Sequence, residues 1–154
     1  MTQRQGPNRP PGPGGPGRPA PTVDQGRLRR ILVDGDDEEL VKFADEVGRR
    51  LKDEGLRASQ VRRFFAEVRR LGDEARVSGQ TDGLGRIFRR LNLLRPKLAY
   101  QTGRNIAGMG QLRDVLDPAI QLVIEDRSKP DRLVRFVELF EAILAYHKFY
   151  GGGD

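Results

Sequence analysis

Residues 130–150, PDRLVRFVELFEAILAYHKFY, are the stretch that decides the fold of this chain. Ser128, with Asp131 three residues later, is predicted to signal the start of a helix over about residues 130–150. Apolar residues then recur at helical spacing, at positions 133, 136, 137, 140, 143 and 144. Because this apolar face is wide, we expect a long helix that several other helices, or a partner chain, contact.

Helical patterns also precede this stretch. Asp36 and Glu39 have the spacing of a capping box for a helix that carries apolar residues as far as Leu51. Ser59 is the predicted N-cap of the next helix, whose apolar stripe ends at Leu71. Residues 72–85 have no periodicity and are predicted to form a mobile connection.

The patterns between residues 86 and 126 are shorter. Residues 86–94 are predicted to be helical, with a break at Pro96 and a further turn or two as far as residue 103. Residues 111–116 and 118–126 are predicted as two helices, because Pro118 resembles a restarted N-terminus. No alternating strand pattern appears, so the expected fold class is all-α, a compact bundle of five or six helices.

The first part of the chain differs in composition from the rest. Its first 22 residues contain seven of the ten prolines, five glycines, three arginines and no acidic residue. Such a segment cannot bury enough apolar area to offset its ordering entropy. We therefore predict a disordered arm rich in Pro, Gly and Arg over residues 1–26 and one helical domain over residues 27–154.

Composition excludes several functional classes. The chain has no cysteine, which excludes disulfides, iron–sulfur clusters and thiol nucleophiles. No apolar run reaches the roughly 18–20 residues that span a bilayer, so we expect a soluble, cytoplasmic protein without membrane contact. The single histidine, His147, lies in an apolar helical face and is expected to be packed and hydrogen-bonded. We therefore expect no catalytic residue, no metal site and no cofactor.

Charge is distributed unevenly along the chain. The formal net charge is +6, but residues 36–46 hold six acids and one Lys, net −5. Residues 57–70 hold five Arg and one Glu, net +4, and residues 86–104 hold five Arg, one Lys and no acid, net +6. This pattern leaves two interpretations open, a basic face for a phosphate backbone or a solvated surface whose charges pair internally. Tyr100 and Tyr146 lie beside cations and could stack on bases, although packing is favoured.

Three segments carry a family resemblance. Residues 56–64, LRASQVRRF, contain a Ser-x-Val-Arg element, and residues 94–104, LRPKLAYQTGR, contain a Tyr-x-x-Gly-Arg element. Residues 141–152, EAILAYHKFYGG, are the most specific match. All three resemble the small subunit of the type III-A CRISPR effector, the Csm complex, and the resemblance covers roughly Glu38 to Asp154.

The resemblance implies a non-catalytic scaffold subunit in antiviral defence. Family members are small helical proteins that stack in several copies along the inside of the effector. There they pack against one another and against other effector subunits. They lie beside the duplex of guide RNA and target RNA and contact the target strand mainly through its backbone.

The resemblance also assigns candidate RNA-binding residues. Arg62 and Arg104, which belong to the matched elements, are the first candidates for phosphate contacts, followed by Lys97 and Lys148. Arg63 and Arg69 are added from the helical charge pattern alone.

The alternative is that Arg62 and Arg104 form internal or intersubunit salt bridges. The chain would then be a purely protein–protein interaction module. The acidic segment could likewise meet a basic neighbour. Reversing Glu38, Glu39 and Glu46 to Lys is then expected to impair assembly but to spare the isolated fold.

Overall fold

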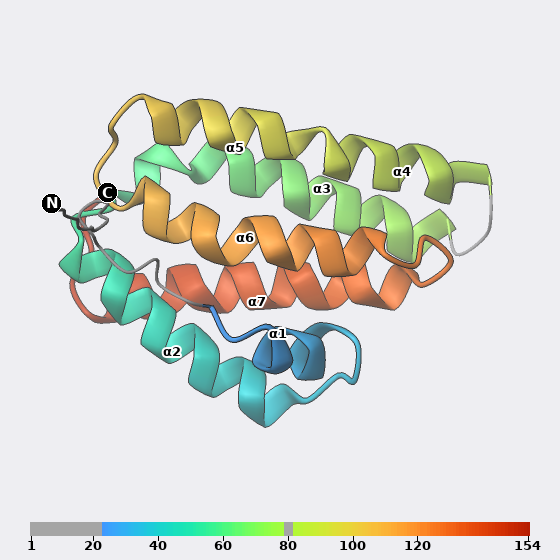
Figure 1. Ribbon diagram of the computed structural model, residues 1–154, viewed down its shortest axis with the longest axis horizontal. Helices are drawn as coiled ribbons and strands as arrows, with labels where there is room; N and C mark the ends of the chain where they lie inside the picture. The colour runs from blue at the N-terminus through green and yellow to red at the C-terminus, as the bar shows by residue number, and fades with distance from the viewer. Residues whose placement is uncertain (1–22, 79–81) are drawn as a thin grey trace, which may run out of the picture.

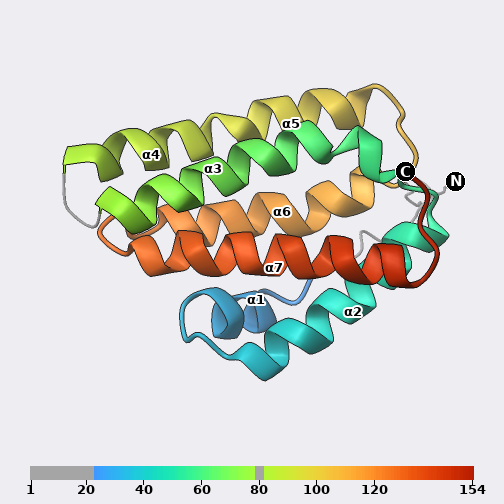
Figure 2. The ribbon, with the colours of Figure 1, turned by 180° about the vertical axis from the view of Figure 1, so that it is seen from behind.

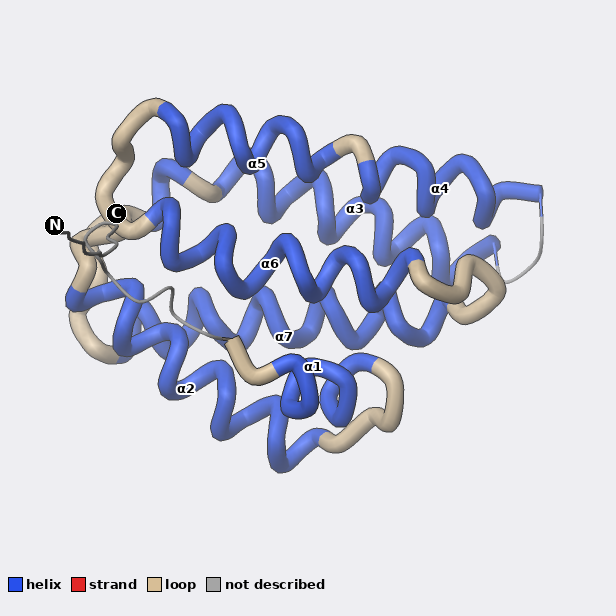
Figure 3. The backbone as a smooth tube through the Cα atoms, viewed as in Figure 1, coloured by secondary structure: helices blue, strands red, loops and turns tan. Residues whose placement is uncertain are grey.

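The structure is a computed structural model that describes residues 23–78 and 82–154. Within these residues it contains α-helices, one 3-10 turn and no strand, which confirms the all-α prediction. The elements are α1 (Gln25–Leu32), α2 (Asp37–Asp53), η1 (Ala58–Gln60), α3 (Arg62–Ser78), α4 (Asp82–Asn92), α5 (Leu94–Gly103), α6 (Met109–Ile124) and α7 (Pro130–Phe149). Only Leu93 separates α4 from α5, and the two continue along one side of the molecule (Figure 3). The described chain therefore packs as six helical segments, within the predicted range.

Helix α7 is the centre of the bundle, as its wide apolar face predicted. It packs against α1, α2, α3 and α6. Figures 1 and 2 show it between α3 and α6 on one side and α1 and α2 on the other. Its buried apolar side chains are Leu133, Phe136, Val137, Leu139, Phe140 and Ile143.

Helix α1 places the start of the folded part earlier than predicted. The Asp24 side chain accepts hydrogen bonds from the backbone N–H groups of Gly26, at 2.9 Å, and Arg27, at 3.2 Å. This cap starts the helix at Gln25, two residues inside the segment assigned to the arm. The three apolar side chains of α1, Leu28, Ile31 and Leu32, are buried in the core. The predicted disorder of residues 1–22 concerns a part of the chain outside the described residues.

Helices α3 and α4 are longer than their sequence patterns indicated. Helix α3 runs to Ser78, so residues 72–78 are helical rather than a mobile connection. Leu71 and Ala75 are buried and continue the apolar face by one more turn. Residues 79–81 lie outside the described residues, and α4 begins at Asp82.

Helix α6 passes through Pro118 without a break. Proline removes one backbone hydrogen bond from a helix. The residues on both sides of it, Val115, Leu116, Ala119 and Ile120, are fully buried, and this packing holds one helix where the sequence predicted two.

Several connections between the helices gather at one end of the bundle. The end of α2, turn η1, the α5–α6 loop and the last residues of the chain meet there, at the left of Figure 1. Within the described residues, no helix is both long enough and apolar enough to cross a bilayer.

Candidate nucleic-acid interface

The fold brings together the three segments that carry the family resemblance. Residues 56–64 form η1 and the first turn of α3, residues 94–104 form α5 and its C-cap, and residues 141–152 form the second half of α7 and the turn after it. The first two segments line a common groove between α3 and α5. The first and third are joined by a hydrogen bond between His147 Nε2 and the Leu56 carbonyl oxygen, at 2.7 Å.

Turn η1 sets the start of α3. Ser59 was predicted to be the N-cap of α3, and this prediction is wrong. Ser59 lies inside η1, and α3 begins three residues later at Arg62. Gln60 closes the turn, because its side-chain oxygen accepts a hydrogen bond from the Arg57 N–H at 3.3 Å. Val61 is buried and anchors the junction, so Arg62 and Arg63 project from the first turn of α3 into solvent.

The groove between α3 and α5 has a volume of about 200 Å³. Arg63 and Lys97 both line it, one from each helix, together with the apolar side chains of Phe64 and Leu94. Glu67, at the same groove, binds Arg70 at 2.5 Å and Arg90 at 3.1 Å, so its charge is already compensated. The structure therefore joins two of the predicted RNA-binding residues in one positively charged hollow.

Arg69 lies elsewhere, in a second groove between α3 and α7. This smaller hollow, about 80 Å³, is also lined by Arg76, Glu138 and Glu141. Arg76 was missed from the sequence because the helix was predicted to end near Leu71. Its signal is nonetheless present, since Arg62, Arg69 and Arg76 repeat every seven residues and lie on one flank of α3.

Most of the predicted cations have no acidic partner. Among the described residues, Arg62, Arg63, Arg69, Lys97 and Arg104 are exposed and make no salt bridge. Arg76, Arg86 and Arg89 on α3 and α4 are likewise exposed and unpaired within the described part of the chain. We call this set, from α3 to the C-cap of α5, the cationic face. Its members are Arg62, Arg63, Arg69, Arg76, Arg86, Arg89, Lys97 and Arg104.

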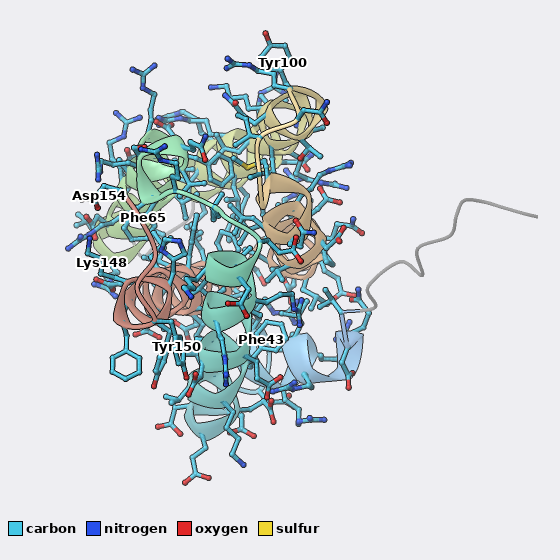
Figure 4. All side chains as sticks on the ribbon, turned by 90° about the vertical axis from the view of Figure 1, so that its left-hand side faces the viewer. Phe43, Phe65, Tyr100, Lys148, Tyr150 and Asp154 are labelled. Carbon is cyan, nitrogen blue, oxygen red and sulfur yellow. The ribbon has the colours of Figure 1, made fainter. Side chains whose placement is uncertain are left out.

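Lys148 is the exception among the predicted residues. Its Nζ binds the Asp154 carboxylate at 3.0 Å. The hydrogen bond from Lys148, with a smaller contribution from the nearby charge of Arg62, holds the pKa of Asp154 below its ordinary value. Figure 4 looks onto this end and shows Asp154 beside Lys148, with Tyr100 well apart from both.

The opposite side of the bundle carries compensated charge. Arg27 of α1 binds Glu39 at 2.5 Å and Glu46 at 2.8 Å, and Arg30 lies 3.6 Å from Glu39. The hydrogen bond from Arg27 holds the pKa of Glu46 below its ordinary value, and the same two glutamates raise the pKa of Arg27 despite its partial burial. Two of the six acids of residues 36–46, Glu39 and Glu46, thus already have a basic neighbour, which is α1 of the same chain. The sequence suggested that Glu39 and Glu46 could meet a basic partner outside the chain. Because α1 already binds both, they are not free for such a partner.

His147 is buried, as predicted. Its Nε2 lies 2.7 Å from the Leu56 carbonyl oxygen, so the ring links α7 to the segment before η1. In the described part of the chain, no group of three or more His, Cys, Asp or Glu side chains could hold a metal ion.

Tyr100 and Tyr146, which were both expected to pack, differ in how far they are buried. Tyr146 packs partly buried against the core, with its ring centroid 6.4 Å from that of Phe149. Tyr100 is 68% exposed on α5, so the packing prediction is wrong for this residue. Its α5 helix covers α6 with Leu94 and Leu98 instead, and Tyr100 is on the solvent side.

Comparison with known proteins gives a consistent result. The family model for Csm2 of type III-A matches residues 34–153. A curated protein of Streptococcus thermophilus, "CRISPR system Cms protein Csm2", is 30% identical over 100 residues, which are 64% of this chain and 76% of that protein. No solved structure matches this chain. The chain therefore belongs to the Csm2 family and is a subunit of a type III-A CRISPR complex.

Proposed function

We propose that this chain is a non-catalytic scaffold subunit that stacks in several copies and binds the backbone of the target RNA beside the guide RNA. The observation that carries the proposal is the contrast between the two sides of the bundle. On α3, α4 and α5 eight cations are exposed and unpaired among the described residues, whereas the cations of α1 bind carboxylates. Exposed, unpaired cations gathered on neighbouring helices favour binding to a polyanion.

The form of binding follows from the side chains present. Arginines and lysines bind phosphate oxygens, which carry no sequence information. The cationic face contains one strongly exposed aromatic side chain, that of Tyr100, which cannot by itself form a platform for reading several bases. We therefore expect binding that is independent of sequence and sensitive to salt.

The test is RNA binding by the assembled complex over a range of salt concentrations. Arg62→Ala combined with Arg104→Ala is expected to weaken binding and to flatten the salt slope by about 0.7 for each lost contact to single-stranded RNA. The matched control is Lys42→Ala with Arg50→Ala, which removes the same charge from exposed, unpaired positions of α2. It should leave the slope unchanged.

The alternative is a purely protein–protein interaction module. It is favoured by apolar side chains left in solvent, since Val77 is 87% and Phe149 75% exposed. The alternative holds if the Arg62/Arg104 variant assembles poorly but those complexes that do form with it bind RNA as the wild-type complex does. A nuclease assay on the purified chain tests the non-catalytic part of the proposal, for which we expect intact RNA.

A further inference from the structure

The last residues of the chain follow a path that the fold fixes. The Gly152 N–H donates to the His147 carbonyl at 2.8 Å, and the Gly153 carbonyl accepts from the Ala58 N–H at 2.9 Å. A Cβ atom at Gly152 would lie 2.2 Å from the imidazole of His147, so only glycine fits against this buried ring. These contacts place Asp154 directly over turn η1.

Several hydrogen-bond donors converge on Asp154 at this position. Its main-chain oxygen accepts from the Ser59 hydroxyl at 3.0 Å and from Arg57 Nε at 3.4 Å. Its side-chain carboxylate accepts from Lys148 Nζ at 3.0 Å. The positive charge of Arg62 is close enough to act on the same carboxylate. Two separate segments of the chain thus build one site for an anion.

This donor set fits a phosphodiester. A hydroxyl, a guanidinium group and an ammonium are groups that usually bind backbone phosphates. Arg57, Ser59 and Lys148 are all exposed, so an RNA strand can reach them.

The contact that now fills the site is weak. The side chain of Lys148 is 62% and that of Asp154 74% exposed, and ion pairs between such groups contribute little in water. A polyanion held along the neighbouring cationic face would replace this single carboxylate at little cost.

We propose that Asp154 occupies a phosphodiester subsite formed by Arg57, Ser59 and Lys148, and that target RNA takes this subsite by displacing Asp154. The inference rests on the proposed RNA-binding function. It adds that Asp154 of the same chain covers one of the phosphate-binding positions until RNA displaces it. Asp154 lowers the affinity of the subunit for RNA that is not held along the cationic face. Lys148 becomes available only to RNA that enters this end of the bundle.

The test uses the assembled complex with the full chain and a labelled target RNA, with anisotropy titrations at several salt concentrations. Asp154→Asn removes the competing charge and keeps the main-chain contacts to Ser59 and Arg57. It is expected to tighten binding about two- to fivefold and to steepen the salt slope by about 0.7, because one more phosphate is bound. Adding Lys148→Gln to Asp154→Asn should cancel both effects, whereas Lys148→Gln alone should change little.

The matched control is Glu54→Gln, which removes one exposed negative charge from the same end of the molecule but not from the subsite. Equal tightening by Asp154→Asn and Glu54→Gln would show a general charge effect and would overturn the subsite. Unchanged RNA binding by Asp154→Asn, with wild-type binding intact, would overturn the subsite and leave the proposed function standing. If neither wild type nor Asp154→Asn binds RNA, both proposals fail.

Discussion

Gly48 decides how closely α2 can approach α7. A Cβ atom at this position would lie 2.7 Å from Tyr146 Cβ and 2.8 Å from both the His147 nitrogen and the Ile143 carbonyl oxygen. Two of these neighbours are backbone atoms, so no rotamer change relieves the clash. We therefore expect Gly48→Ala to lower the free energy of unfolding by about 1–3 kcal/mol, measured by urea denaturation.

Gly85 provides the matched substitution. It also lies inside a helix, α4, but a Cβ atom there would meet nothing within 4 Å. Gly85→Ala should raise the free energy of unfolding by about 0.5–1 kcal/mol, because alanine loses less backbone entropy in a helix. A similar change in the free energy of unfolding in both variants would mean that the close approach of α2 to α7 does not determine the effect at Gly48.

Single residues show where sequence reasoning worked. Asp36 caps α2 as its spacing to Glu39 predicted, with a hydrogen bond of 3.0 Å from the Glu39 N–H. His147 is buried and bonded, because a histidine inside an apolar stripe must find a partner. Ser59 failed as a predicted cap because its hydroxyl binds Asp154, 95 residues away in the sequence. A local pattern contains no information on such a contact.

At the scale of elements, α1 and α2 are joined by charge as well as by apolar packing. Arg27 binds Glu46 and Glu39, and its guanidinium lies 5.0 Å from the centre of the Phe43 ring. Because Arg27 holds the folded pKa of Glu46 below its ordinary 4.5, this carboxylate stabilises the fold at neutral pH. The contribution is present above the unfolded pKa and is lost as the pH falls through the folded pKa.

This predicts a pH-dependent effect of Glu46→Gln. At pH 7 the variant should be less stable than wild type by at most about 1 kcal/mol, since the Glu46 side chain is 56% exposed. The difference should shrink towards zero as Glu46 is protonated in acid, as followed by urea denaturation at a series of pH values. Glu38→Gln, an exposed acid on α2 without a salt bridge among the described residues, should show no such trend. A pH-independent loss in Glu46→Gln would contradict the role given to the charge.

The same contacts change what charge reversal of the acidic segment should do. Glu39→Lys with Glu46→Lys places two ammonium groups against Arg27, whose side chain is only 21% exposed. We expect the isolated fold to lose about 2–3 kcal/mol, whereas Glu38→Lys should stay within about 0.5 kcal/mol of wild type. Thermal melts of the purified variants distinguish the two, and equal stability would return Glu39 and Glu46 to the set available for an external partner.

Element boundaries were the least predictable part of the fold. The apolar stripe of α3 continues through Leu71 and Ala75, but the polar residues around them hid the last turn. Pro118 suggested a break in α6 that tertiary packing overrides. By contrast, the bounds of α7 could be predicted almost to the residue, because its apolar stripe is long, although Ser128 does not cap the helix as predicted: Lys129 is the N-cap and Ser128 binds Asp126.

For the molecule as a whole, the net charge hides a division into two sides. The unpaired cations of α3, α4 and α5 and the salt bridges that join α1 to α2 lie on different sides of α7 (Figures 1 and 2). The segment charges suggested a basic and an acidic side, because each charged segment forms one or two whole helices, but they left open which charges pair internally. The sequence could not predict that α1 supplies the counter-ions of α2, since residues 25–32 precede the part that matches the family.

Truncation from the N-terminus tests whether α1 belongs to the folded unit. Removing residues 1–22 should leave the free energy of unfolding unchanged, because every described contact of α1 remains. Removing residues 1–33 deletes Leu28, Ile31 and Leu32, each at most 1% exposed, and the Arg27 salt bridges. Burial of such side chains contributes about 1.5–3 kcal/mol each, a large share of the roughly 5–15 kcal/mol that holds a domain folded. The longer truncation should therefore melt far below the shorter one or fail to fold. If both truncations melt at the wild-type temperature, the folded unit starts at the boundary of the family match and α1 is an accessory helix.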